Sequence, residues 1–258
     1  MVNIIFCGCF GRMGNAVRRI VKESCTQDEK NTQELKIVAG VDICEEDAEF
    51  PVYKVISDVK ESADVIIDFS SPKALDSILE YSVSKNVPVV LCTTGYSEEQ
   101  LAQIKEASEK VAILRSANMS LGINTLAKLI QTAAQILADN GYDIEIVERH
   151  HNQKKDAPSG TALLLADAIN AACDGRYEYV YDRSDRSMAR PKNEIGISAV
   201  RGGSIVGDHE VIFAGLDEVV EIKHTAYSRN VFAKGAVSAA TFLAGKPAGL
   251  YTMSDVIG

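Results

Sequence analysis

The stretch that decides the fold is Val2-Asn3-Ile4-Ile5-Phe6-Cys7-Gly8-Cys9-Phe10-Gly11-Arg12-Met13-Gly14. Its apolar run predicts a buried β-strand, and a helix is expected after the last glycine, ending at about Ser24. The glycines are spaced G-x-x-G-x-x-G, which suits a tight turn, close approach of a ligand to the backbone, and a helix N-terminus that faces a pyrophosphate. The alternative is a glycine-rich turn without a ligand. Arg12 is expected either to contact the phosphates or to lie on the surface.

Strands and helices alternate through the first half of the chain. The expected strands are Val2–Cys7, Leu35–Val41, Asp64–Phe69, Val87–Cys92 and Ala112–Arg115. Later helices are expected from Pro72 to Lys85 and from a capping box at Ser97 to Lys110. This alternation predicts an α/β fold with a Rossmann-like, doubly wound parallel sheet. Ligands of such sheets bind at the carboxyl ends of the strands, which is where Gly8, Asp42, Ser70, Thr93 and Asn118 lie.

Asp42 stands at the end of the second expected strand. An acidic residue there can accept hydrogen bonds from an adenosine ribose, although an ordinary strand-end aspartate is the alternative. The 2′-phosphate of NADPH would be repelled by the negative charge of Asp42. The residues after Asp42 are Ile43, Cys44 and the acidic run 45–47, which supply no positive charge. The sequence therefore predicts a preference for NADH over NADPH, unless Arg12 or a lysine from a distant loop neutralises the phosphate.

The second half of the chain has a different pattern. A long amphipathic helix, Leu121–Asp139, is followed by an expected strand at Ile144–Val147 and a helix at Ala162–Ala172. The basic segment Tyr177–Lys192 is expected to be a mobile loop, and Gln27–Gln33 a surface loop. A mostly antiparallel sheet of a second, α+β domain is predicted, with a helix and a final strand or turn after it. Its strands are expected at Ile195–Val200, Ser204–Val206, Glu210–Ala214 and Val219–His224. The helix is expected at Ser228–Leu243, and the final strand or turn at Tyr251–Ile257.

Between the expected strand and helix of this second domain runs a loop of titratable residues, Glu148 to Thr161. A turn that only reverses the chain is usually built from Gly, Asn and Ser, so this composition indicates a working loop. His150 and His151 can move a proton near neutral pH. Adjacent residues of an extended segment point to opposite sides, and the chain has no Cys-x-x-Cys, so the paired histidines are not expected to bind a metal.

The end of this loop predicts an anion site. Ser159 is a good N-cap for the following helix, and Gly160 allows a ligand to come close to the backbone. The N–H groups of Gly160, Thr161 and Ala162 are expected to be free and to bind a carboxylate or phosphate, with Lys154 adding a positive charge. The alternatives are that Ser159 only caps its helix and that the lysines are solvated loop charges.

The composition narrows the class of protein. The chain has 258 residues, 46% hydrophobic residues and a net charge of −9, which allows one large or two modest domains and argues against a nucleic-acid partner. It lacks an apolar run of transmembrane length and a signal peptide, so no membrane partner is expected. The scattered cysteines are expected to be reduced in a cytoplasmic protein. They are Cys7, Cys9, Cys25, Cys44, Cys92 and Cys173.

The loop motif closely resembles the signature of the dihydrodipicolinate reductase family, now called 4-hydroxy-tetrahydrodipicolinate reductases. The matched residues read Glu-x-His-His-x-x-Lys-x-Asp-Ala-Pro-Ser-Gly-Thr-Ala from Glu148 to Ala162. The family's Gly-Arg-Met-Gly, Thr-Thr-Gly and Asn-x-Ser-x-Gly-x-Asn segments are matched at 11–14, 93–95 and 118–124, and Cys92 stands where the family usually has glycine. The resemblance spans essentially the whole chain.

The resemblance implies an NAD(P)H-dependent enzyme of the diaminopimelate route to lysine. Hydroxy-tetrahydrodipicolinate loses water, and a hydride from the nicotinamide yields tetrahydrodipicolinate. Residues 1–119 and 229–258 are expected to bind the dinucleotide, and residues 120–228 to bind substrate and form a homotetramer. The family assigns proton donation to the positions of His150 and Lys154, while His151, Ser159, Gly160 and Thr161 are expected to bind the dicarboxylate substrate. The expected cofactor residues are Gly8, Cys9, Phe10, Gly11, Arg12, Met13, Asp42, Phe69, Ser70, Cys92, Thr93, Thr94, Ser116, Ala117, Asn118, Met119, Arg229 and Phe232.

Two alternatives belong to other functional classes. One is a dinucleotide-dependent reductase of a different carboxylate. The other is a non-catalytic NAD-sensing regulator, which would keep the glycine loop but would have no need of the cluster of His150 and Lys154 beside an anion site.

Overall fold

The computed structural model describes residues 1–24, 34–44 and 46–258. The expected surface loop Gln27–Gln33 and Cys25 lie outside the described residues. The chain forms two compact units, Met1–Leu121 with Asn230–Gly258, and Gly122–Arg229. These boundaries fall within two residues of the expected ones.

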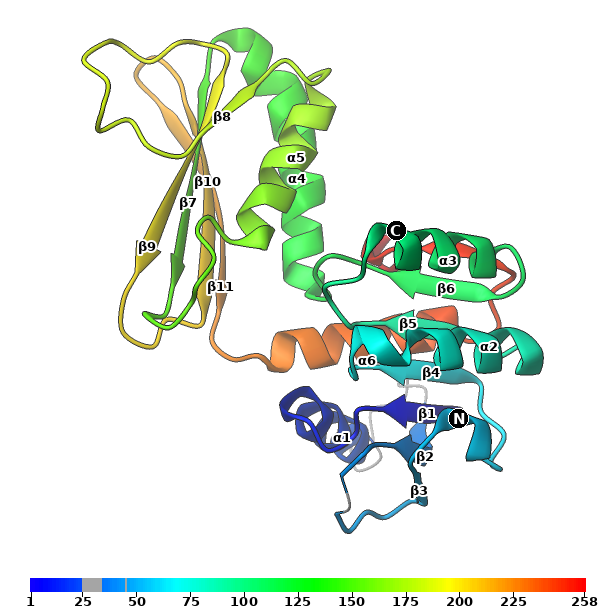
Figure 1. The fold of residues 1–258 in the computed structure, drawn as a ribbon. Coiled ribbons are helices and arrows are strands. Elements are labelled where there is room, and N and C mark those ends of the chain that lie inside the picture. The colour runs from blue at the N-terminus through cyan, green and yellow to red at the C-terminus, as the bar shows by residue number, and fades with distance from the viewer. Residues whose placement is uncertain (25–33, 45) are drawn as a thin grey trace. The chain divides into compact units, whose positions relative to one another are not determined.

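The first unit contains a parallel sheet of seven strands in the order β12-β6-β5-β4-β1-β2-β3 (Figure 1). The strands are β1 (Val2–Cys7), β2 (Leu35–Val41), β3 (Val52–Tyr53), β4 (Val65–Asp68), β5 (Val89–Leu91), β6 (Ala112–Arg115) and β12 (Gly249–Tyr251). The helices are α1 (Arg12–Ser24), α2 (Leu75–Lys85), α3 (Glu98–Ser108), α6 (Asn230–Leu243) and α7 (Met253–Ile257). Short 3-10 turns lie at Ile56–Asp58 and Pro72–Ala74. This is the predicted α/β, Rossmann-like arrangement.

Both faces of this sheet are buried, because successive side chains of a strand point to opposite sides. Val2, Ile4 and Phe6 of β1 join a core with residues of α1 and α6. Ile5 and Cys7 join a second core with residues of α2 and α3. The near-continuous apolar strands seen in the sequence follow from this burial on both sides.

The second unit contains a sheet of five strands in the order β11-β10-β7-β9-β8. Its strands are β7 (Asp143–His150), β8 (Glu178–Val180), β9 (Glu194–Arg201), β10 (Gly207–Ala214) and β11 (Val219–Ala226). Its helices are α4 (Leu121–Leu137) and α5 (Gly160–Ala172), with a 3-10 turn at Ala138–Asn140. One face packs on these helices, since Ile144 and Ile146 of β7 share a core with Leu126 and Ile130 of α4 and Leu165 of α5.

The expectation of a mostly antiparallel second sheet is wrong. β10 pairs antiparallel with β7 and β11, but β9 pairs parallel with β7 and β8. The physical reason is the long connection from β7 to β9, which contains α5, because parallel neighbours require a crossover of this kind. The strand expected at Ser204–Val206 is also absent, and β10 begins at Gly207. Just before it, the N–H of Gly202 donates to the carbonyl of His150, and Gly203 has a φ of +48°.

The segment Tyr177–Lys192, expected to be a mobile loop, contains a short strand and several ion pairs. Residues 178–180 form β8, at the edge of the sheet. The basic residues are held by carboxylates: Arg183 binds Glu145 through two N–H···O bonds of 3.0 and 2.8 Å, and Arg186 pairs with Glu194. These basic side chains therefore anchor the segment to β7 and β9.

The C-terminal segment was assigned to a strand or turn, and it contains both a strand and a helix. β12 ends at Tyr251, and α7 follows as Met253–Ile257. Thr252 and Asp255 form a capping box, in which the N–H of Thr252 donates to Asp255 Oδ2 over 2.7 Å. The described cysteines have free thiols. No helix in the described part of the chain combines the length and apolar character needed to cross a bilayer.

Candidate functional site

The glycine loop of the first unit is shaped by lack of space. Gly8 has a φ of +78°, and a Cβ there would lie 2.7 Å from the carbonyl oxygen of Phe69. A Cβ at Gly14 would lie 2.4 Å from the carbonyl oxygen of Cys9, whereas one at Gly11 would make an ordinary contact of 3.5 Å. Gly8 and Gly14 are therefore required by the backbone. The loop leads into α1, which begins at Arg12, so backbone donors and a helix N-terminus suit a pyrophosphate.

Asp42 braces this loop. Its Oδ2 accepts the N–H of Phe10 over 2.9 Å, and its Oδ1 accepts the N–H of Cys44 over 3.0 Å. Each carboxylate oxygen has a second lone pair, so Asp42 can still accept a ribose hydroxyl. Lys54 also reaches this edge, since its Nζ donates to the carbonyl of Ile43 over 2.8 Å. Sequence inspection did not find this lysine because it comes from the segment after β3.

A buried carboxyl group that the sequence did not single out lies at the end of β4. Asp68 is 1% exposed, and its Oδ1 accepts both the N–H and the hydroxyl of Ser70, over 2.9 and 2.5 Å. The hydroxyl of Tyr96 lies 3.4 Å from its Oδ2. Burial raises the pKa of Asp68, and the bonds from Ser70 oppose this rise. Asp68 thus ties the turn after β4 to the segment that follows the Thr93–Thr94 turn.

The other expected cofactor residues are distributed along the same edge of the sheet. Phe69 and Ser70 follow β4, Cys92 to Thr94 follow β5, and Ser116 to Met119 follow β6. Burial, reinforced by Asp68, raises the pKa of the Cys92 thiol. Phe232 lies in α6 and packs against the core that β1 and α1 share. Arg229 is the last residue of the second unit.

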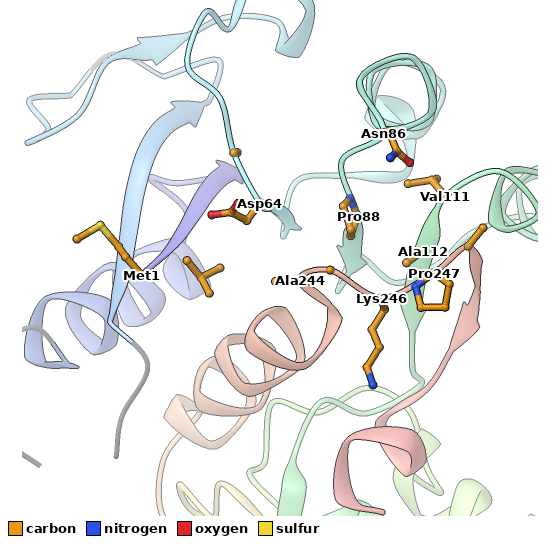
Figure 2. A pocket seen from close by; sticks show the side chains of 13 residues that line it. Met1, Asp64, Asn86, Pro88, Val111, Ala112, Ala244, Lys246 and Pro247 are labelled. Carbon is orange, nitrogen blue, oxygen red and sulfur yellow. The ribbon is translucent and has the colours of Figure 1, made fainter. Parts of the chain in front are cut away.

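A cavity of about 570 Å³ lies at the opposite, amino end of this sheet (Figure 2). Asp64, Pro88, Val111 and Lys246 line it together with neighbouring residues. None of the expected site residues takes part. We assign it no role, because the chemistry-bearing residues of the first unit gather at the carboxyl ends of the strands.

His150 ends β7 in the second unit and is 8% exposed. Its Nδ1 lies 2.6 Å from Oε2 of Glu148, which is fully buried. Arg201 of β9 binds both oxygens of Glu148, each over 2.7 Å. Burial alone would raise the pKa of Glu148, but the bonds from Arg201, His150 and Ser159 outweigh it, and the pKa is lowered. Burial lowers the pKa of His150, and Glu148 only partly offsets this.

Ser159 is the N-cap of α5, as expected. Its Oγ accepts the N–H of Ala162 over 3.1 Å, so the prediction that this N–H is free is wrong. The same Oγ lies 2.9 Å from Nε2 of His209, and the N–H of Ser159 donates to Glu148 Oε1 over 2.9 Å. With its side chain engaged and 2% of its surface exposed, Ser159 shapes the helix start rather than facing solvent. Gly160 is exposed at this terminus, but its N–H donates to the carboxylate of Asp156, so the prediction that it is free is also wrong; Thr161 is half-buried.

Lys154 and His151 lie on the loop between β7 and α5. The ammonium group of Lys154 is 2.9 Å from Oδ2 of Asp156, and its side chain is 20% exposed. This ion pair lowers the pKa of Asp156. Nδ1 of His151 is buried and has no hydrogen-bond partner in the described part of the chain. No group of three potential metal ligands occurs among residues 1–24, 34–44 and 46–258.

Sequence inspection missed two residues of this network, Arg201 and His209. His209 lies on β10, and its ring centroid is 5.1 Å from that of His150. Burial and the neighbouring His150 lower the pKa of His209 to about 3. Both residues lie in a stretch that looked like strands and glycine turns, and nothing local marked them. Glu148 begins the sequence motif, but its role follows only from its partners in the structure.

Comparison with known proteins assigns both units. The model of the N-terminus of dihydrodipicolinate reductase matches residues 2–119, and that of its C-terminus matches residues 122–257. The 4-hydroxy-tetrahydrodipicolinate reductase of Caldanaerobacter subterraneus subsp. tengcongensis is 51% identical, over 100% of this chain and 98% of the relative. That of Clostridium novyi is 50% identical, with the same shares covered. A dipicolinate-bound dihydrodipicolinate reductase from Paenisporosarcina sp. TG-14 has a TM-score of 0.80 at 24% identity, over 98% of this chain and 97% of that one.

The glycine loop on a parallel sheet and the matched nucleotide-binding unit define an oxidoreductase that uses a pyridine nucleotide. The chain belongs to the dihydrodipicolinate reductase family.

Proposed function

We propose that this protein reduces 4-hydroxy-tetrahydrodipicolinate, by way of dihydrodipicolinate, to tetrahydrodipicolinate in the diaminopimelate route to lysine. Relatives of about half-identical sequence carry this name over their full length. The structural observation that supports it most directly is the buried His150 beside the start of α5, since the reaction needs a proton and its substrate has carboxylates to bind. The similar Paenisporosarcina protein was solved with dipicolinate, a planar dicarboxylate.

The second unit is proposed to hold and protonate the substrate. The N-terminus of α5, at Gly160 and Thr161, attracts one carboxylate through the helix dipole. His151, half-buried on the loop before α5, binds a carboxylate through its imidazole. His150 and Lys154 donate the proton or stabilise the developing charge. Ser159 contributes by capping α5.

The first unit is proposed to hold the dinucleotide through the loop residues 8–13, through Asp42, and through the turns after β4, β5 and β6. Bound nicotinamide supplies the hydride. Asp42 accepts ribose hydroxyls and disfavours a 2′-phosphate, so NADH is the preferred cofactor. Lys54, which reaches Ile43, gives the same edge a positive charge and lets NADPH bind more weakly rather than not at all.

The protein is also proposed to be a homotetramer assembled through its second unit. The side chains of β7 alternate between buried and half-buried, so one face of the sheet is covered by helices and the other is not. Apolar residues are exposed on β9 and β11, at Val200, Val219 and Val220. Such exposed apolar surface is typical of subunit interfaces. Light scattering coupled to size-exclusion chromatography tests this directly, and a monomer at micromolar concentration would contradict it.

An assay of NADH absorbance, with the substrate made in situ by the preceding synthase, tests the proposed reaction. Oxidation of NADH should require the synthase product and should be inhibited by pyridine-2,6-dicarboxylate. Turnover of another carboxylate substrate but not this one would favour the different reductase. Binding of NADH without any turnover would favour the regulator.

A further inference from the structure

The buried carboxylate of Glu148 forms hydrogen bonds with two groups of the second unit that have separate roles in the proposed reaction. Its Oε2 lies 2.6 Å from Nδ1 of His150, the proposed proton donor. Its Oε1 accepts the N–H of Ser159, the N-cap of the anion-binding helix α5. Arg201 binds both oxygens and so balances the charge of a group with no exposed surface. A buried carboxylate needs such partners, because a lone buried charge is strongly destabilising.

We infer that Glu148 is a positioning residue that fixes the tautomer of His150 and its place relative to the start of α5, with Arg201 setting the strength of this effect. The inference rests on the proposed function for the role of His150, whereas the hydrogen bonds of Glu148 are observed independently of that function. Glu148 touches neither substrate nor cofactor in this account. It acts through His150 and Ser159.

The tautomer follows from hydrogen-bond chemistry. An ionised carboxylate can only accept, so the nitrogen of His150 that faces it must carry a proton. Neutral His150 is therefore protonated on Nδ1, and Nε2 is the nitrogen that gains and releases the working proton. A Cβ at Gly207 would lie 3.0 Å from this Nε2, so glycine keeps space open beside it.

The charges around His150 come from every element packed against it. Glu148 of β7 favours the protonated ring, whereas Lys154 of the loop and Arg201 of β9 oppose it. His209 of β10 lies in edge contact with the ring, and a protonated His150 disfavours a proton on His209. His224 of β11 acts on His209 in the same sense. Removing Glu148 and removing Arg201 should therefore move the pKa of His150 in opposite directions.

Histidine NMR is the direct test, since the chain has only four histidines to assign. In the wild type, the ¹⁵N shifts should show Nδ1 of neutral His150 protonated. In Glu148→Gln this tautomer preference should weaken, and the pKa of His150 should fall by about one unit or more, the usual size of a lost charge partner at hydrogen-bond distance. In Arg201→Met the pKa should rise, and in the matched control Arg201→Lys it should stay near the wild-type value.

Arg201→Met also keeps the test decisive if Glu148→Gln fails to fold, because the sign of its shift is predicted independently. Pyridine-2,6-dicarboxylate should bind Glu148→Gln about tenfold more weakly, because the amide has a single acceptor oxygen and cannot accept from both His150 and Ser159, while NADH affinity stays unchanged. An unchanged tautomer together with an unmoved His150 pKa in Glu148→Gln, or no rise of that pKa in Arg201→Met, would overturn the inference whatever the activity.

The pH profile separates this inference from the proposed function. If His150 donates the proton, it must be protonated to act, so the alkaline limb of kcat/KM should move to lower pH in Glu148→Gln and to higher pH in Arg201→Met. NMR shifts without a matching move of that limb would leave Glu148 as the positioning residue but would remove His150 as the proton donor.

Discussion

The candidate sites of the two units are formed by different parts of the residues: mainly the backbone in the first unit, and mainly side chains in the second. The first unit uses backbone: Gly8 and Gly14 make room, and Asp42 holds the N–H of Phe10. The second unit uses buried side chains whose charges balance one another, with Glu148 bound by both His150 and Arg201. A backbone site depends on local space and is marked by glycine spacing. A side-chain network depends on partners from several strands, so each member is sensitive to the loss of another.

The largest effect is expected at Lys154, where the second site depends on a side-chain charge. Lys154→Ala should lower turnover by about a hundredfold or more, the scale of a positioned acid or charge. The thermal midpoint should change little, because the ion pair with Asp156 involves a largely exposed carboxylate. The neighbouring Lys155 is exposed, so Lys155→Ala is the matched control and should behave like the wild type. Equal turnover in both variants would remove Lys154 from the mechanism.

The glycine loop should respond to added volume instead of lost charge. Gly14→Ala places a methyl group 2.4 Å from a backbone carbonyl oxygen, so the loop must shift. NADH should bind about thirtyfold more weakly, corresponding to about 2 kcal/mol of strain at the binding loop. Gly11→Ala is the control within the same motif, since its methyl would make an ordinary contact of 3.5 Å. Fluorescence titration with NADH measures both, and similar losses in the two variants would show that space at Gly14 is not the cause.

The anion site at α5 should be separable from the cofactor site. Thr161→Val removes a hydroxyl beside the helix start but keeps the shape of the side chain. The affinity for pyridine-2,6-dicarboxylate should fall by about tenfold, the worth of one hydrogen bond to a charged group. Calorimetry measures this, and NADH affinity serves as the internal control. Unchanged inhibitor binding would place the anion site elsewhere.

The smallest effect is expected on the choice between NADH and NADPH, which depends on charged side chains of the first unit. Values of kcat/KM for NADH and NADPH at matched ionic strength should favour NADH. Lys54→Met should raise this preference about threefold further, because it removes a positive charge near Ile43 that offsets Asp42. Asp42→Ala should reduce the preference. A wild type that uses NADPH equally well or better would overturn the argument from Asp42.

Local patterns predicted much of the fold. The alternation of apolar strands with helices predicted a doubly wound parallel sheet, and the structure has a sheet buried on both faces. The capping box at Ser97 was visible as a short motif. Errors arose where pairing partners are distant in sequence. The parallel pairing of β7 with β9 depends on a crossover. The ion pairs of the basic segment around Arg183 could not be predicted, because its partner Glu145 lies on a distant strand.

The sequence by itself determined the parallel sheet with its glycine loop, the N-cap at Ser159, and the motif that carries His150 and Lys154, although His150 ends β7 and only Lys154 lies on the loop. These features depend on residues near one another in the chain, where spacing, volume and capping act directly. Only the tertiary structure decided that Arg201 and His209 join Glu148 around His150, and that Lys54 reaches the carbonyl of Ile43 next to Asp42. Such contacts arise when strands from separate segments pair, and buried charge then selects its partners by distance in space.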